Sequence, residues 1–292
     1  MKKIDNTSIV SKYSLLVVAC SYSLNPAEML KKLVRLDKKF KINLSGVIVS
    51  NGAHEFQSEN QDWPIIKGSN FDYDFSAYFE GASFLNNKQS LDHVTVIFLN
   101  DSFFTSHDTY GQFHLLLNLI PLVVRVNSPA IIGRISYYHS ICFKNPWSGL
   151  NLFVPTYCFA LNAEGIRVLL DLNKLADNDG LTNENQVIDD NWGRKLNLQF
   201  FEYLRSVVII KESPYFWKQF GIYPPSRTLL YKKARCVYFE HRLSGELAKD
   251  GCIIPINSGV VRFLYVLVRD FIASFIKKII ARIMLKNRHD FK

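Results

Sequence analysis

The chain has 292 residues, of which 48% are hydrophobic, and it contains 22 Phe and 14 Tyr. This composition excludes an intrinsically disordered chain, and the length allows one large α/β domain or two smaller ones. The net charge is +9, and 258–292 supply +6 of it through eight Lys or Arg and two Asp. A nucleic-acid-binding protein more often carries its charge over a folded face with aromatic residues interleaved, so we expect no nucleic-acid partner.

Five cysteines lie scattered along the chain, and no two of them have the CxxC spacing. An odd, scattered set indicates a reducing compartment rather than a disulfide framework or a zinc site. No stretch reaches about 18 uncharged apolar residues, so we expect no transmembrane helix. The apolar run at 15–20 is too short for a signal peptide, and we interpret it as a buried strand.

The first 100 residues alternate between strand and helix patterns. Asn25 and Pro26 suit the start of a helix. Apolar runs predict strands at 14–20, 45–52 and 94–101, and helical spacing predicts helices at 27–40 and 74–87. Such alternation indicates a mostly parallel sheet with helices on both faces, whose ligands bind at the carboxyl ends of the strands. We therefore expect 21–23, 51–52 and 100–102 to surround one crevice.

After Thr105 the pattern is less regular. We expect a helix from 110 to Pro121, a helix at 162–172 and another from about Asp189 to Leu204. The remaining segments are predicted to be strands at 130–135, 152–161 and 206–213, a polar loop at 175–186, and loops that fold over the crevice at 213–241.

Two segments carry residues typical of a nucleotide site. Asp101 lies at the end of the strand predicted at 94–101, where a carboxylate can hold a divalent cation, although Asn, Asp and Ser are also common turn residues. Asp74 is expected to cap the helix that begins there. That helix would direct its partially positive N-terminus at the crevice, where a phosphate is favoured.

Together, NFDYDFSAY at 70–78 and VIFLNDSFF at 96–104 resemble glycosyltransferases related to the rhamnan synthesis protein F family. They are more distantly similar to family 2 glycosyltransferases of the GT-A fold. The positions that match the two family motifs are Asn70, Tyr73, Asp74, Phe75, Ala77, Tyr78, Leu99, Asn100, Asp101 and Ser102. Asp72 and Ser76 depart from the family pattern, which usually has glycine there, and Gly68-Ser69 replace an expected basic residue.

The resemblance implies a GT-A-like, Rossmann-type α/β domain, which we place at 1–257. It further implies that Asn70 and Asp74 bind the nucleotide part of a nucleotide-sugar donor, with Asn100 and Ser102 beside them. Asp101 would stand where the metal ligand of a D-x-D motif stands, holding Mn²⁺ or Mg²⁺. The presence of only one carboxylate at the strand end leaves the metal dependence open.

Two later segments complete the set of candidates. Asp189 and Asp190 look like the acidic pair that opens a helix in many GT-A enzymes and faces the acceptor hydroxyl. Asp190 is preferred as the general base by motif alignment, and first-turn acids that only stabilise the helix are the alternative. His241 is a candidate ligand of the metal or diphosphate, although a lone His is more often a packing residue. Four basic residues near it are candidates to clamp the diphosphate, or else form a solvated loop: Lys232, Lys233, Arg235 and Arg242.

The segment 258–292 is expected to contain a basic amphipathic helix. Its apolar residues recur at intervals of three or four, and its basic residues become more frequent towards the end. We expect it to lie in the surface of the membrane, with docking on the protein's own core or on a partner subunit as the alternative.

The leading functional hypothesis is an inverting glycosyltransferase that extends a lipid-linked O-antigen or capsule polysaccharide. It would be cytoplasmic and peripherally attached to the inner face of the plasma membrane. One alternative is a sugar nucleotidyltransferase, although 21–25 are not the Gly-rich basic loop that this class needs. The other is a membrane-associated polysaccharide assembly protein without catalytic activity.

Overall fold

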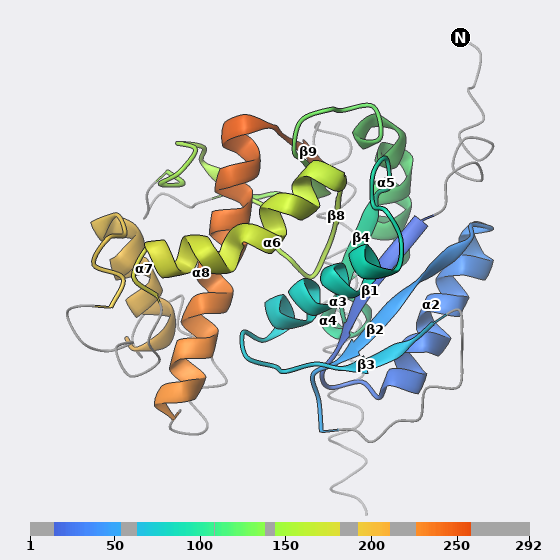
Figure 1. The fold of residues 1–292 in the computed structure, drawn as a ribbon, viewed down its shortest axis with the longest axis horizontal. Helices are drawn as coiled ribbons and strands as arrows, with labels where there is room; N and C mark the ends of the chain where they lie inside the picture. The colour runs from blue at the N-terminus through green and yellow to red at the C-terminus, as the bar shows by residue number, and fades with distance from the viewer. Residues whose placement is uncertain are drawn as a thin grey trace, which may run out of the picture.

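The structure is a computed structural model that describes 15–53, 63–107, 109–137, 144–181, 192–210 and 226–257. These residues form an α/β fold around a seven-stranded mixed sheet with the strand order β3-β2-β1-β4-β8-β5-β9 (Figure 1). The strands are β1 (Leu15–Ser21), β2 (Leu44–Ser50), β3 (Ile65–Lys67), β4 (Val96–Asn100), β5 (Ala130–Gly133), β8 (Cys158–Leu161) and β9 (Cys252–Pro255). A separate ribbon pairs β6 (Ser136–Tyr137) with β7 (Leu152–Phe153).

The order and direction of the strands create a switch point between β1 and β4. β1 pairs in parallel with β2 on one side and with β4 on the other, and β3 continues the parallel run beyond β2. β8 is antiparallel to both β4 and β5, whereas β5 and β9 are parallel. The chain thus moves outward from β1 to β3 and then returns to β4, so the order reverses between β1 and β4. Such a switch point leaves a crevice at the carboxyl ends of the two strands, where ligands of open α/β sheets bind.

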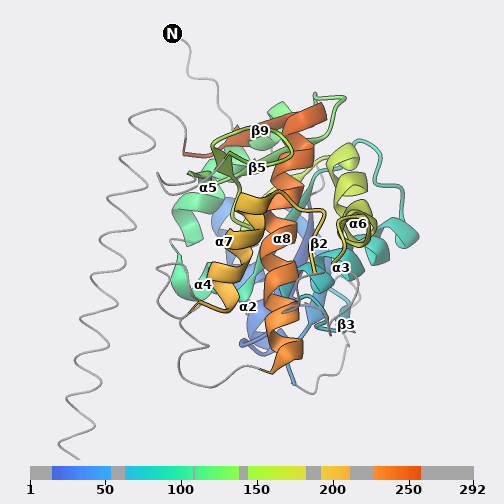
Figure 2. The same ribbon diagram turned by 90° about the vertical axis from the view of Figure 1, so that its left-hand side faces the viewer.

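Helices cover both faces of the sheet (Figures 1 and 2). One face packs against α2 (Pro26–Phe40), α4 (Asp101–Ser106) and α5 (Thr109–Val123). The other packs against α3 (Asp74–Lys88), α6 (Ala163–Asn178), α7 (Leu198–Val208) and α8 (Arg227–Asp250). The prediction of helices on both faces of a mostly parallel sheet is confirmed.

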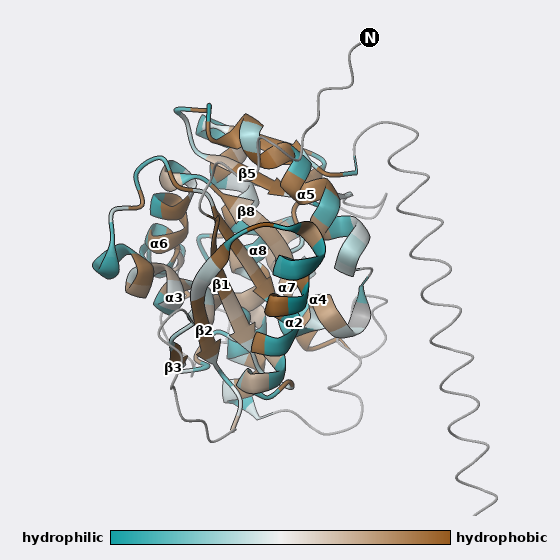
Figure 3. Ribbon diagram, turned by 90° about the vertical axis from the view of Figure 1, so that its right-hand side faces the viewer, coloured by the Kyte–Doolittle hydropathy of each residue, from teal (hydrophilic) through white to brown (hydrophobic). Residues whose placement is uncertain are grey.

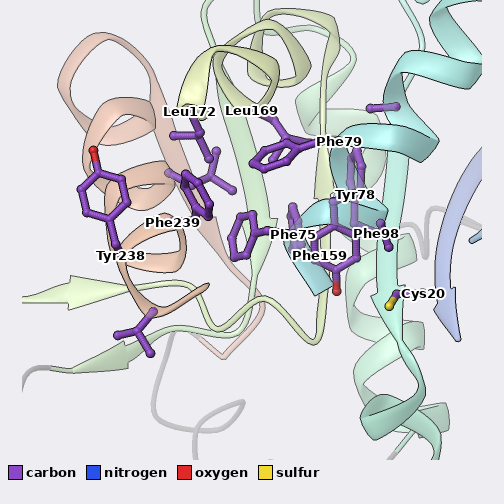
Figure 4. Packing of buried hydrophobic residues seen from close by; sticks show 14 of the residues in the cluster. Cys20, Phe75, Tyr78, Phe79, Phe98, Phe159, Leu169, Leu172, Tyr238 and Phe239 are labelled. Atoms are coloured by element: carbon purple, nitrogen blue, oxygen red, sulfur yellow. The ribbon is translucent and has the colours of Figure 1, made fainter. Parts of the chain in front are cut away.

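An aromatic cluster joins the sheet to α3 and α8 (Figure 4). Phe98 on β4 and Phe159 on β8 stack with their ring centroids 5.0 Å apart. The ring centroid of Phe75 on α3 lies 5.3 Å from that of Phe239 on α8. At Gly81 an added Cβ would lie 2.4 Å from a methyl group of Val18, so α3 packs closely on β1. The first turn of α3 is therefore held firmly against the carboxyl ends of β1 and β4.

Sequence patterns predicted the chain well up to Asn100 and in part beyond it, where β5, β8 and α6 coincide with segments expected to be strands and a helix. β1, α2, β2, α3 and β4 lie within two residues of the expected bounds, and Asn25 caps α2 by accepting a hydrogen bond from the amide of Ala27 at 2.8 Å. The strand expected at 206–213 is wrong where the structure describes it, because 206–208 are the last turn of α7. The loops expected at 213–241 are also wrong from Arg227 onward, where α8 runs for 24 residues.

Three smaller expectations are corrected as well. Pro121 lies inside α5 rather than ending it. The helix expected from Asp189 begins at Leu198, where Asn197 is the N-cap, and 192–196 form turns. Residues 175–178 are the last turn of α6 rather than loop. Within the described ranges no helix is long and apolar enough to cross a membrane. The predicted helix at 258–292 lies outside the described residues.

Candidate functional site

Polar side chains from three elements meet at the carboxyl edge of β1 and β4. Asp74, the first residue of α3, accepts a hydrogen bond from Nδ2 of Asn100 at 2.5 Å. The thiol of Cys20, near the end of β1, lies 3.4 Å from the other carboxylate oxygen of Asp74. The carboxylate of Asp74 is thus held by both strands that border the switch point.

Burial dominates the electrostatics of this carboxylate. It raises the pKa of Asp74 above the ordinary value, and the hydrogen bonds from Asn100 and Cys20 counteract part of the rise. The nearby charge of Asp101 raises the pKa further, and that of Lys233 lowers it. Asp74 does not cap α3 as expected, because its side chain points to the strands and Tyr73 occupies the N-cap position.

The loop before α3 has an unusual backbone. Asn70 and Tyr73 have φ angles of 52° and 53°, in the left-handed region that residues with a Cβ seldom adopt. Asn51, just after β2, holds this loop by donating from Nδ2 to the carbonyl of Tyr73 at 2.7 Å. Such strain persists only when neighbouring contacts enforce it, and it is common at ligand sites. The contact between Asn51 and Tyr73 holds the loop that contains Asn70 beside the carboxyl end of β2.

Asp101 fixes the loop that follows β1. Its Oδ2 accepts hydrogen bonds from the amides of Tyr22, Ser23 and Leu24 and from the hydroxyl of Ser23, at 2.5 to 3.1 Å. Ser102 donates its hydroxyl to Oδ1 of Asn100 at 2.5 Å. Asp101 and Ser102 thus stabilise the loop after β1 and the end of β4 through contacts within the protein.

The described residues do not by themselves form a metal centre at this edge. Oδ2 of Asp101 accepts four hydrogen bonds from its own loop, so this oxygen is not available to an ion. Among the described residues, no group of three or more His, Cys, Asp or Glu side chains is arranged to hold a metal ion.

The helix α8 crosses beside the 70–73 loop and binds it through two basic residues. Nε and Nη2 of Arg235 contact the two carboxylate oxygens of Asp72 at 2.8 and 3.3 Å. The remaining nitrogen of the guanidinium donates to the carbonyl of Leu181, and Nη2 also contacts Asn173. Nζ of Lys232 donates to the carbonyl of Asn70 at 2.8 Å.

The four basic residues that were expected to clamp a diphosphate therefore lie in different environments. Arg235 is only 4% exposed and Asp72 2%, so Arg235 anchors the loop and its guanidinium is not available to a diphosphate. Asp72, which replaces the glycine usual in the resembling family, is the partner that makes this anchor possible. Lys232 and Lys233 are half-buried at the same place, and the charge of Lys233 acts on Asp74. Arg242 forms ion pairs with Asp179 and Glu246, farther along α8.

Glu240 is a carboxylate that the sequence patterns did not single out as a site residue. It accepts hydrogen bonds from the amide and the hydroxyl of Thr156 at 2.8 and 3.2 Å. Burial raises its pKa, the charge of Lys233 lowers it and that of Asp74 raises it. The charge of Lys233 thus acts on two half-buried residues, Asp74 and Glu240.

His241 belongs to a different environment. Its ring is 1% exposed and lies among Phe153, Phe200 and Tyr203, with ring centroids 4.3 to 5.5 Å away. Burial lowers its pKa from 6.5 to about 3, so the imidazole is neutral at physiological pH. The side chain packs in an aromatic core, and the structure gives no support to the metal role expected from the resemblance.

Asp189 and Asp190 lie outside the described residues. The chain after them is anchored by Trp192, which is buried near Phe201, and by Gly193, whose amide donates to the carbonyl of Gly180. Because α7 begins only at Leu198, the acidic pair does not lie at the N-terminus of this helix.

One pocket lined by described residues lies at the amino end of β4, away from the carboxyl ends that carry the candidate site. It is lined by residues before β4, between α5 and β5, and at the start of α6: Asp92, His93, Val94, Val123, Val124, Val126, Asn127, Asn162, Ala163 and Glu164. Its walls contain none of the residues expected to bind a donor.

The fold and the polar cluster define an α/β protein with a candidate anion site at a switch point of its sheet. No family model matches the chain, and no curated protein matches it either.

Proposed function

We propose that this protein is a glycosyltransferase that uses a nucleotide-sugar donor and acts on a lipid-linked or growing surface polysaccharide. The supporting observation is the contact between Asp74 and Asn100 at the carboxyl ends of β1 and β4, with the charge of Lys233 acting on Asp74 and with Lys232 bound to the carbonyl of Asn70 in the loop before α3. The resemblance at 70–78 and 96–104 supports the same conclusion.

The donor would bind through its diphosphate and nucleoside. Lys232, Lys233 and the N-terminus of α3 supply the positive potential that a diphosphate requires. The ring of Tyr22, which is 46% exposed, lies 6.4 Å from that of Tyr73 and offers an apolar surface at the rim. Polar groups buried beneath the rim, including Asp74 and Asn100, would keep the surrounding loops in place.

The reaction would be a single displacement. An acceptor hydroxyl oxygen would form a bond to the anomeric carbon of the sugar while the bond from this carbon to the diphosphate oxygen breaks. The hydroxyl proton would pass to a general base, for which Asp190 remains the proposal. The negative charge that develops on the leaving diphosphate would be stabilised by Lys232 and Lys233.

A panel of nucleotide sugars tests this function. The full-length protein is incubated with each donor and with a lipid-linked saccharide extract, with and without Mn²⁺ or Mg²⁺, and release of the nucleoside diphosphate is measured. We expect release with at least one donor, and Asp190→Asn should abolish it without changing the melting temperature. Absence of release and of donor binding across the panel would contradict the proposal.

The assembly protein without catalytic activity has one observation in its favour. One carboxylate oxygen of Asp101, the residue that the resemblance assigns to a metal, accepts four hydrogen bonds from 22–24. Donor binding without turnover in the same panel would favour this second candidate.

A further inference from the structure

The outer face of α2 carries a dense row of cations. Its exposed basic residues and the one that follows its last turn are Lys31, Arg35, Lys38, Lys39 and Lys41, which we call the basic face. Lys31, Arg35 and Lys38 are spaced by four and three residues, so they lie on one side of the helix. The opposite side packs on the sheet through Met29, Leu33 and Leu36. Figure 3 shows this helix in front of the sheet, with hydrophilic colour along its outer side.

The cations of this face outnumber the carboxylates of the same helix, Glu28 and Asp37. Within the described part of the chain, none of its cations forms an ion pair with a carboxylate. Asp37 turns inward and accepts a hydrogen bond from the amide of Leu44 at 2.9 Å. Glu28, three residues before Lys31, forms no ion pair with a cation of the described residues, and the neighbouring helix α5 contains no acidic residue. A row of like charges without counter-charges is costly unless an anionic partner neutralises it.

Apolar groups are interleaved with these cations. Val34 is 37% exposed between Lys31 and Lys38 in the helical row, and Tyr110 at the start of α5 is 44% exposed. Nζ of Lys39 lies 5.3 Å from the centroid of the Tyr110 ring. A helix with cations outside and exposed aliphatic and aromatic groups among them matches the layered chemistry of a membrane surface. There phosphate headgroups lie above the acyl boundary, and aromatic rings prefer the level between the two.

We propose that the basic face of α2, with Val34 and Tyr110, binds the surface of a bilayer that contains anionic lipids. The 15-residue helix is about 22 Å long and would lie along the surface. Because α2 begins directly after the 22–24 loop, this contact would fix the orientation of the crevice relative to the bilayer. The proposal concerns a region distinct from 258–292 and does not depend on the catalytic function.

Vesicle co-sedimentation of the full-length chain tests this surface. The probes are vesicles of neutral phosphatidylcholine, alone or with about one third phosphatidylserine. The variant neutralises three cations of the basic face, K31Q/R35Q/K38Q. The matched control neutralises three exposed lysines of the opposite helical layer, on α3, α6 and α8, as K88Q/K174Q/K249Q.

We expect binding of the wild type to anionic vesicles and a loss of about tenfold to a hundredfold in K31Q/R35Q/K38Q, since each cation near such a surface contributes roughly fivefold. The control should bind within about twofold of the wild type. Equal losses in the two variants, or no loss in either, would overturn the proposal. Melting temperatures within the error of the wild type show that both variants are folded.

A second variant separates a bilayer from other polyanions. V34S/Y110S leaves every charge in place, so we expect it to weaken vesicle binding while leaving weak binding to a short DNA duplex unchanged. If V34S/Y110S binds vesicles as the wild type does, and K31Q/R35Q/K38Q loses DNA binding to the same extent as vesicle binding, the face is a general polyanion surface. The lipid proposal is then wrong.

Discussion

The guanidinium of Arg235 on α8 lies 2.8 Å from the carboxylate of Asp72, and both side chains are shielded from solvent. The pair joins two segments that are 163 residues apart in the sequence. It also holds the loop in which Asn70 and Tyr73 adopt left-handed backbone angles. Burial raises the pKa of Asp72, and the charge of Arg235 counteracts this rise. The geometry of the candidate site thus depends on a contact that lies beneath it.

Loss of the Arg235 charge should destabilise the protein strongly. Arg235→Met leaves Asp72 buried without its partner, and removal of one member of such a pair costs about 3–5 kcal/mol. The free energy of unfolding in urea measures this effect. Arg167→Gln is the control, because its partner Asp92 is exposed and that ion pair contributes under about 1 kcal/mol. Similar losses in the two variants would contradict the role of Arg235 as an anchor.

Replacement of Asp101 should loosen the loop after β1. Asp101→Ala removes the acceptor of four hydrogen bonds, so hydrogen exchange at the amides of Tyr22, Ser23 and Leu24 should accelerate by at least about tenfold. Mass-spectrometric exchange on peptides that cover 21–25 measures this change. Asp92→Ala, at an exposed position, should leave these peptides unchanged. Unaltered exchange in Asp101→Ala would show that other contacts hold the loop.

Glu240 should make the protein less stable as the pH rises. Its folded pKa is raised above the ordinary value of 4.5, so the folded state binds the proton more tightly than the unfolded chain does. Its contribution is therefore most favourable below pH 4.5 and is lost as the pH rises through the folded pKa.

The variant Glu240→Gln tests this relationship. It keeps the oxygen that accepts from Thr156 and removes the charge, so it should be more stable than the wild type at pH 8 and lose this advantage below pH 4.5. Thermal melts across this range measure the difference. Glu202→Gln, at an exposed site, should follow the wild-type curve.

His241 should contribute to acid denaturation. Its folded pKa of about 3 lies below the ordinary 6.5, so the unfolded chain binds a proton first and stability falls as the pH drops below 6.5. The loss attributable to this group should reach roughly 3 kcal/mol at pH 4. His241→Phe keeps an aromatic ring in the same cluster and should flatten this part of the pH profile. A variant as acid-sensitive as the wild type would contradict the assignment.

The sequence predicted those elements whose pattern is contained in a few neighbouring residues. Continuous apolar runs predicted β1, β2 and β4, and Asn25 with Pro26 predicted the start of α2. The carboxyl ends of these strands then placed Asn51, Asn100 and Asp101 at one edge. That inference needs only the parallel topology, which alternating strands and helices already imply.

The contribution of α8 could not be predicted in the same way. Its sequence mixes aromatic and basic residues because the helix packs on the sheet layer while also binding the 70–73 loop. A charged residue at a buried helix position, such as Arg235, therefore appeared to belong to a solvated loop. The partner that makes its burial tolerable, Asp72, is remote in sequence, and no local pattern reveals such a pair. The two interpretations of His241 could not be separated for the same reason, since its aromatic neighbours come from β7 and α7.

The most direct test of the central claim is equilibrium binding of nucleoside diphosphates and their sugar conjugates to the full-length protein. The account predicts that the wild type binds at least one member and that K232Q/K233Q, which removes the two cations beside Asn70 and Asp74, binds it at least about tenfold more weakly. The matched variant K88Q/K249Q should bind as the wild type does. Equal affinity of the wild type and K232Q/K233Q, or no binding by the wild type to any member, would contradict a nucleotide-sugar site at the carboxyl ends of β1 and β4.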